Sequence, residues 1–230
     1  MLNEFKNQAK ENLESIIVLT DFTLCCNKEE VFVHMNCSNT SPSFEQVEET
    51  YEMLEKQIYE LIKPVASLKF ANGVDNLQSK EVTANDSVIY CFTSLGKKVS
   101  ELSNLYFGQG DYLAGMMADL MSDFLLFQMD GIVLEALKKE CSKRKKGILK
   151  RLEAPIDVPM EAQKIILSVV SNPLIEHCLV TDGYMYSPVK SSGYIFLLTD
   201  DETVFKGKHN CKTCSASNNC AFCKKSEDER

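Results

Sequence analysis

One stretch of the sequence, residues 111–137, decides the fold class, and it reads DYLAGMMADLMSDFLLFQMDGIVLEAL. Its apolar residues recur at helical spacing and cover most of a helix circumference, which predicts a long helix largely enclosed by the rest of the protein. Asp111 stands where an N-cap residue is expected. Asp119, Ser122 and Asp123 interrupt the apolar run, so it does not have the composition of a membrane span. We expect its methionines to fill the core rather than to line a ligand surface.

The segments on either side of this helix alternate between helical and strand patterns. Upstream, Ser41 and Pro42 are typical of a helix start, with Ser41 as the cap, and a helix with one apolar face then continues until Pro64. In order, we expect strands at residues 65–70 and 82–93, a helix at 97–107, an extended proline loop at 151–159, a helix at 160–171, strands at 179–181 and 184–186, a polar loop at 187–193 and a strand at 194–198. The sequence therefore predicts an α+β fold with a twisted antiparallel sheet and several helices.

Composition and charge indicate a soluble cytoplasmic protein. The apolar run at residues 16–19 is far shorter than the core of an export signal, and no membrane association is expected. A net charge of −8 argues against nucleic acid as a partner. Because a reducing compartment disfavours disulfides, the ten cysteines are expected to be buried thiols or metal ligands.

A basic segment at residues 138–151 departs from this acidic average, with eight basic residues and one acid, Glu140. Cations at the C-terminal end of a helix complement its macrodipole, so a solvated helix end is one interpretation. The other is a docking patch for an acidic partner, such as an electron-donor protein, or for a phosphate-bearing ligand.

Four cysteines lie close together near the C-terminus, at Cys211, Cys214, Cys220 and Cys223. Two pairs of thiolates with this spacing can converge on one metal, which predicts a compact four-cysteine knuckle. Zinc and a 4Fe–4S cluster take the same ligand set, and both alternatives stay open. Two labile disulfides or unconstrained thiols are the remaining alternatives.

Several motifs in order resemble the activation (reactivation) domain of cobalamin-dependent methionine synthase and its free-standing bacterial homologues. They are residues 92–99, residues 110–130, residues 151–163 and the turn at 179–193, LVTDGYMYSPVKSSG, which is the most similar of the four. The resemblance spans roughly residues 42–200. It implies an N-terminal extension at residues 1–41, an activation-domain-like domain at 42–205 and a cysteine-rich metal-binding tail at 206–230.

The resemblance implies binding of S-adenosylmethionine, whose methyl group remethylates an oxidised cobalamin while an external donor supplies an electron. A zwitterionic amino-acid end calls for a carboxylate-binding cation and a rigid loop, and Arg151 matches the arginine of the family's ligand loop. The family follows that arginine with Pro-Gly-Tyr, whereas Ile156 and Asp157 follow the proline here. The ligand residues implied are Arg151, Glu153, Pro155, Pro188, Lys190, Ser191, Ser192, Gly193 and Tyr194, and the proline bend near 155 should face the serine-glycine corner near 190 across one crevice.

The family's corrinoid-binding motif, Asp-x-His-x-x-Gly, is absent from the sequence. The chain is therefore expected to bind no corrinoid itself and to act on one held by a corrinoid protein or a cobalamin-dependent methyltransferase. If it is active, it is of the methyltransferase type. Two other hypotheses stay open, a non-catalytic metal-stabilised adaptor that keeps the fold without the ligand loop, and an iron–sulfur redox protein of a corrinoid pathway.

Overall fold

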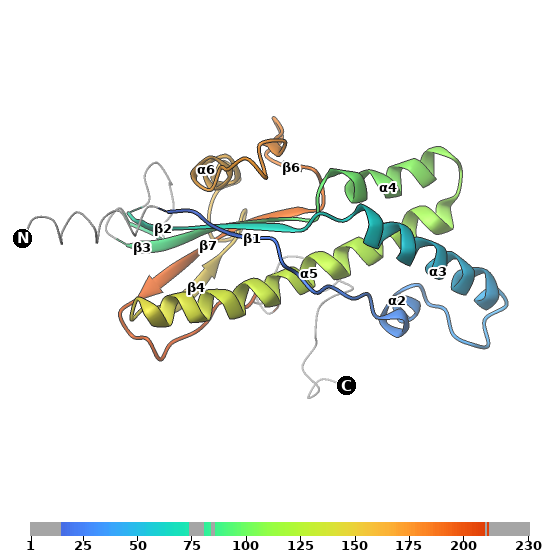
Figure 1. Ribbon diagram of the computed structural model, residues 1–230, viewed down its shortest axis with the longest axis horizontal. Helices are drawn as coiled ribbons and strands as arrows, with labels where there is room; N and C mark the ends of the chain where they lie inside the picture. The colour runs from blue at the N-terminus through green and yellow to red at the C-terminus, as the bar shows by residue number, and fades with distance from the viewer. Residues whose placement is uncertain (1–14, 74–80, 84–85, 210, 212–230) are drawn as a thin grey trace, which may run out of the picture.

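The computed structural model of the chain describes residues 15–73, 81–83, 86–209 and 211. Five strands form one antiparallel sheet in the order β1-β2-β3-β7-β4, and β5 pairs with β6 in a separate ribbon (Figure 1). The elements are β1 (Ile17–Leu19), α2 (Lys28–His34), α3 (Phe44–Leu61), β2 (Val65–Asn72), β3 (Ser87–Ser94), α4 (Lys97–Gly108), α5 (Tyr112–Lys143), β4 (Gly147–Leu152), α6 (Ala162–Val169), β5 (Leu179–Val180), β6 (Tyr186–Ser187) and β7 (Ser191–Thr199). The predicted α+β class and the antiparallel sheet are confirmed.

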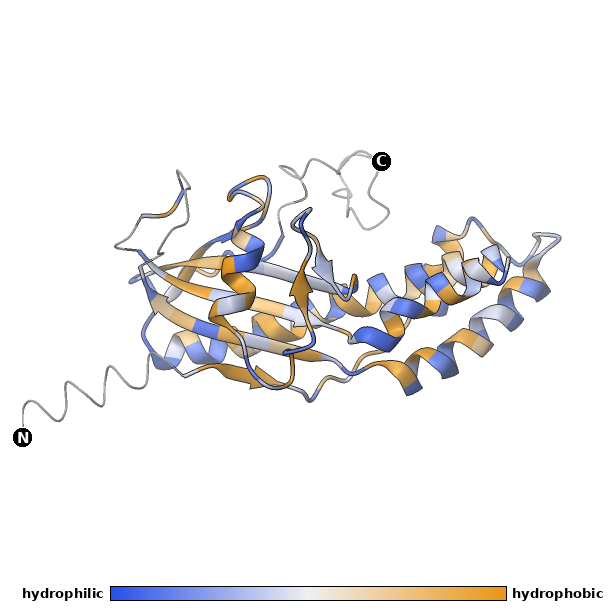
Figure 2. Cartoon of the chain, turned by 90° about the horizontal axis from the view of Figure 1, so that it is seen from above, coloured by the Kyte–Doolittle hydropathy of each residue, from blue (hydrophilic) through white to orange (hydrophobic). Residues whose placement is uncertain are grey.

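The five-stranded sheet separates two hydrophobic layers. On β3, Ile89 and Cys91 point toward α5, while Tyr90 and Phe92 point toward α6, as the period of two in a strand requires. Figure 1 shows α5 on one side of the sheet and α6 with β6 on the other. Both faces are covered, so β3 is buried along nearly its whole length, and Figure 2 shows hydrophobic stretches along the strands of the sheet.

Helix α5 extends beyond the sheet into a helical lobe that it shares with α2, α3 and α4 (Figure 1). Its 32 residues correspond to about 48 Å of helix, so its first half packs in the lobe and its second half on the sheet. Asp111 caps it by accepting a hydrogen bond from the Ala114 amide at 3.0 Å. Met117 and Met121 are fully buried, which confirms the core role of the methionines, whereas Met116 remains exposed on the open side.

Three expectations from the sequence are corrected by the fold. Helix α3 is N-capped at Ser43, and the Ser41 hydroxyl instead accepts a hydrogen bond from the Ser38 amide at 2.9 Å. Residues 191–193 are not part of a loop but begin strand β7. The basic segment contains strand β4, which the sequence did not reveal because its residues include charged side chains on an edge strand.

The N-terminal part of the described chain contributes to the same architecture. Strand β1 lies within the predicted extension and pairs with β2, with Ile17 opposite Leu68. Beyond β7, the chain returns along the outer edge of β4, where Phe205 forms a parallel bridge with Ile148. Of the helices in the described ranges, none combines the length and the apolar composition needed to cross a membrane.

Candidate functional site

The pairing of β4 with β7 brings the two predicted ligand corners to the same end of the sheet. Leu152 at the end of β4 lies opposite Ile195, two residues after Gly193. Because the strands are antiparallel, the bend at Pro155 follows β4 on the side where β7 begins. The proline bend and the serine-glycine segment are therefore neighbours, although 36 positions separate Pro155 from Ser191 in the sequence.

Arg151, Glu153 and Tyr194 are in direct contact beside Asp130 of α5. The Arg151 guanidinium stacks on the Tyr194 ring, with 3.7 Å between its Cζ and the ring centroid. Its Nη1 donates to Asp130 Oδ2 at 2.8 Å, and the Tyr194 hydroxyl donates to Asp130 Oδ1 at 2.9 Å. Asp130 thus orients both the cation and the aromatic ring.

One polar atom of this cluster lacks a proper partner. Arg151 is 9% exposed, and its buried Nε makes no well-aligned hydrogen bond within the described part of the chain. Glu153 Oε1 lies 2.7 Å from that Nε, close enough for an ion pair but poorly aligned for a hydrogen bond. Burial alone would lower the pKa of Arg151, but the charge of Asp130, with a contribution from Glu153, outweighs it and raises the pKa above its usual value.

The buried Lys190 forms a second cluster with two acids of the same helix, of which Asp119 is exposed. Its ammonium lies 2.7 Å from carboxylate oxygens of both Asp119 and Asp123, which are one turn apart on α5. Burial raises the pKa of Asp123, and Asp119 adds to this effect while Lys190 opposes it. The Lys190 backbone also bridges two elements, since its amide donates to the Ser100 hydroxyl and its carbonyl accepts from the Leu95 amide.

The remaining predicted residues build the backbone around these cations. The hydroxyls of Ser191 and Ser94 form a hydrogen bond at 2.8 Å. The Ser192 carbonyl accepts a long hydrogen bond from the Thr93 hydroxyl. Gly193 is required by packing, because a Cβ there would lie 1.9 Å from the Tyr186 hydroxyl oxygen. Both proline corners contain cis peptide bonds, at Pro155, which is exposed, and at Pro188, which is buried.

The sequence reasoning missed the three acids that hold the cations. Asp119, Asp123 and Asp130 all come from α5 and all face residues at or just before the start of β7 or the end of β4. Their spacing of four and seven residues places them along one side of the helix. Acids on one face of an otherwise apolar helix were the available signal, because buried carboxylates need cationic partners.

The basic segment is largely neutralised within the chain. Salt bridges join Glu140 to both Lys143 and Arg144, and Lys146 and Lys150 also have acidic partners. Three members have no ion pair within the described ranges, namely Lys138, Lys139 and Lys145. The free positive charge of the segment is therefore smaller than its composition indicates.

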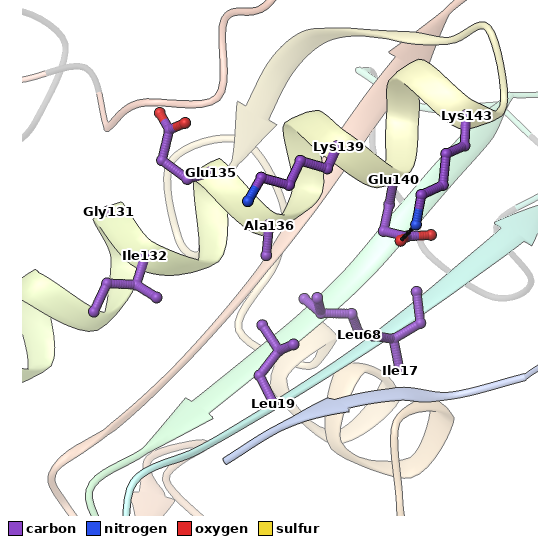
Figure 3. Close-up of a pocket in the computed structure, with 10 residues that line it drawn as sticks. All are labelled: Ile17, Leu19, Leu68, Gly131, Ile132, Glu135, Ala136, Lys139, Glu140 and Lys143. Carbon is purple, nitrogen blue, oxygen red and sulfur yellow. Dashed lines mark hydrogen bonds and ion pairs between the residues drawn. The ribbon is translucent and has the colours of Figure 1, made fainter. Parts of the chain in front are cut away.

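A groove of about 680 Å³ lies at the opposite edge of the sheet, between α5 and the pair β1–β2 (Figure 3). Apolar side chains of Ile17, Leu19 and Leu68 form its strand side, and Glu140 with Lys143 lies at one end of the helix side. It is not the predicted crevice, because the sheet order places β1 and β4 at opposite edges.

The predicted metal ligands are only partly within reach of the structure. Cys211 is described, and Cys214, Cys220 and Cys223 lie outside the described residues. Within residues 15–73, 81–83, 86–209 and 211, no group of three or more His, Cys, Asp or Glu side chains is arranged to hold a metal ion. The four-cysteine knuckle stays a prediction.

Comparison with known proteins supports the fold at the level of structure. No protein-family model matches the chain, and no curated protein sequence matches it. The crystal structure of the MetH reactivation domain bound to AdoHcy is similar, with a TM-score of 0.55 at 9% sequence identity over 80% of this chain and 78% of that one. This chain therefore has a fold similar to that of the MetH reactivation domain.

Proposed function

We propose that this chain binds S-adenosylmethionine and supports reductive methylation of a corrinoid held by a separate protein. The similar MetH domain was solved with AdoHcy, the product that remains when S-adenosylmethionine has lost its methyl group. In the proposed reaction the methyl carbon leaves the sulfonium sulfur, which keeps the bonding electron pair, and bonds to cobalt that has accepted one electron from an external donor. The protein's contribution is to hold and orient the nucleoside.

The observation that carries this proposal is the unsatisfied buried Nε of Arg151. Buried polar groups are normally hydrogen-bonded, so a buried donor without a well-aligned acceptor on a fixed cation favours an anionic ligand at this position. A ligand carboxylate would complete the guanidinium, whose Nη1 is already held by Asp130. Glu153, 24% exposed beside it, would receive the ammonium of the same amino-acid end.

The other ligand residues have supporting roles in this proposal. Lys190 fixes the segment that precedes β7 against α5, and Gly193 lets Tyr186 approach the strand. Pro155 and Pro188 shape the two corners, and Ser191, Ser192 and Tyr194 belong to strand β7, which begins just after Pro188. Ile156 is 45% exposed at the position where the resemblance implies a glycine, and it would lie at the mouth of the site.

The C-terminal cysteines and the basic segment belong to the proposal as partner sites. Four thiolates suit zinc or a 4Fe–4S cluster, and a cluster would serve electron transfer to the corrinoid. The lysines free of ion pairs in the described chain, Lys138, Lys139 and Lys145, are the positions where an acidic electron donor would dock. The corrinoid protein or cobalamin-dependent methyltransferase that accepts the methyl group is a separate chain.

Isothermal titration of the full-length protein with AdoHcy and S-adenosylmethionine tests the proposal. The wild type should bind both, and Arg151→Met should weaken binding at least tenfold because it keeps the aliphatic stem but removes the charge. Arg144→Met is the matched control, since Arg144 also pairs with a carboxylate and stacks on an aromatic ring but lies outside the site. No binding by the wild type removes the proposal.

A non-catalytic adaptor is the second candidate, and one observation favours it. Arg151 and Lys190, the two cations at the site, each already contact two carboxylates of this chain. A scaffold needs nothing more from them. Methyl transfer from labelled S-adenosylmethionine to a corrinoid protein, with a low-potential reductant present, separates the candidates, because an adaptor transfers no label.

A further inference from the structure

The segment after β7 covers the Arg151 site from outside. It runs parallel to β4, with the Ile148 amide donating to the Val204 carbonyl at 2.9 Å and the Lys206 amide donating to the Ile148 carbonyl at 2.8 Å. Four residues beyond the Phe205 bridge, His209 therefore reaches the level of Glu153, five residues beyond Ile148. The register of this edge pairing thus delivers an imidazole to the ligand site.

Glu153 is held on both sides in this arrangement. Its Oε1 lies 2.7 Å from Arg151 Nε, and its Oε2 lies 2.5 Å from His209 Nδ1. The side chains of Glu153 and His209 are 24% and 36% exposed, whereas that of Arg151 is 6% exposed. Glu153 and His209 thus stand between solvent and the one edge of the guanidinium that lacks a proper hydrogen bond.

We propose that the Glu153–His209 contact is an autoinhibitory latch over the Arg151 anion site, and that an amino-acid ligand opens it by exchanging ion pairs. This inference rests on the proposed function. The ligand carboxylate replaces Glu153 at Arg151 Nε, and Glu153 turns to the ligand ammonium. The exchange conserves charge, because a zwitterion enters between the two partners of an existing ion pair.

The exchange also breaks the hold on the C-terminal segment. His209 loses its acceptor when Glu153 turns, and the chain upstream of it stays anchored by the two backbone hydrogen bonds at Ile148 and by the packing of Phe205 against the core. His209 stands two residues before Cys211 in the sequence. Occupancy of the ligand site is therefore communicated to the start of the cysteine-rich segment.

The test compares AdoHcy binding by full-length wild type and His209→Ala, at equal metal content. Removing the latch should lower the Kd about two- to fivefold, the range that a partly exposed contact with a carboxylate contributes. His177→Ala, a change of an exposed imidazole elsewhere, should leave the Kd unchanged. 5′-Methylthioadenosine, which lacks the amino-acid end, should bind wild type and His209→Ala equally.

Hydrogen exchange provides a second readout in the unmodified protein. Saturation with AdoHcy should accelerate amide exchange at residues 204–209, and 5′-methylthioadenosine should not. An unchanged or higher Kd in His209→Ala, or slower exchange in that segment on binding, overturns the latch while AdoHcy binding still supports the proposed function. Absence of AdoHcy binding to the wild type and to His209→Ala overturns both.

Discussion

The strongest energetic prediction concerns the buried pair of Arg151 and Asp130. The two side chains are 6% and 17% exposed, and Asp130 also accepts a hydrogen bond from the Tyr194 hydroxyl. Arg151→Met keeps most of the packing on Tyr194 but leaves the Asp130 carboxylate buried with that single donor. Removal of one partner from a buried ion pair strands the other charge, which costs more than the pair itself contributes.

The expected loss follows from this burial. Stranding a buried carboxylate costs about 3–5 kcal/mol, and the lost cation–π contact at 3.7 Å adds about 0.5–2 kcal/mol. For a chain of 230 residues, each kcal/mol corresponds to a shift of about 2–4 °C in Tm. Together these losses amount to about 3.5–7 kcal/mol, so Arg151→Met should lower the Tm by roughly 7–28 °C.

A double-mutant cycle separates the ion pair from the packing. Asp130→Asn removes the negative charge and keeps an oxygen that can accept from Tyr194, so Arg151→Met in that background should cost about 2 kcal/mol less. Urea unfolding at pH 7, followed by circular dichroism, measures all four proteins. Additive losses, or a loss below about 1 kcal/mol for Arg151→Met alone, would refute the reasoning that this pair is buried and coupled.

Three further predictions concern other parts of the molecule. Gly193→Ala should destabilise the protein by more than about 2 kcal/mol in thermal unfolding, because its Cβ would collide with Tyr186, and Tyr186→Phe should relieve part of that loss. As a control, Gly131→Ala, whose added Cβ meets no neighbouring side chain within 4 Å, should stabilise α5 by about 0.5–1 kcal/mol. Lys190→Met should lower the free energy of unfolding by about 2 kcal/mol at pH 7, and this loss should shrink as the pH falls. The reason is that burial raises the pKa of Asp123, so its carboxyl is protonated more readily in the folded state and then needs no cation. A pH-independent loss in urea unfolding would contradict this. Elemental analysis of protein purified without air should find zinc or iron, and replacing the second cysteine of each CxxC pair with serine should remove it.

The sequence by itself determined the elements whose patterns are continuous along the chain. Helix α5 carries its apolar pattern from Tyr112 to Leu137, about seven turns, and Asp111 caps its start as its side-chain chemistry predicts. Helix α3 likewise carries Val47, Tyr51, Leu54 and Ile58 on the face that is buried. These features depend on residues three or four positions apart, so local periodicity was enough to predict them.

The sequence also pointed to two candidate ligand segments, which the fold brings together, without revealing their contacts. Arg151 could be assigned to the exposed basic cluster or to a ligand loop, because composition alone does not distinguish the two. The structure places it on β4 with its side chain under α5, while neighbouring Lys150 pairs with surface acids. Alternation along a strand sends adjacent residues to opposite environments, and strand β4 was not visible in the sequence.

Only the tertiary structure decided which charges meet. Asp130 lies 21 positions before Arg151 and Glu153 lies 56 positions before His209. The first contact depends on how α5 packs against β4, and the second on how the chain after β7 runs along β4. Long-range pairings of this kind follow from strand order and register, which no local pattern specifies. The sequence determined the helices, the strand-forming segments and the chemistry available at the site, and the packing of α5 across the sheet decided that this chemistry is buried and paired.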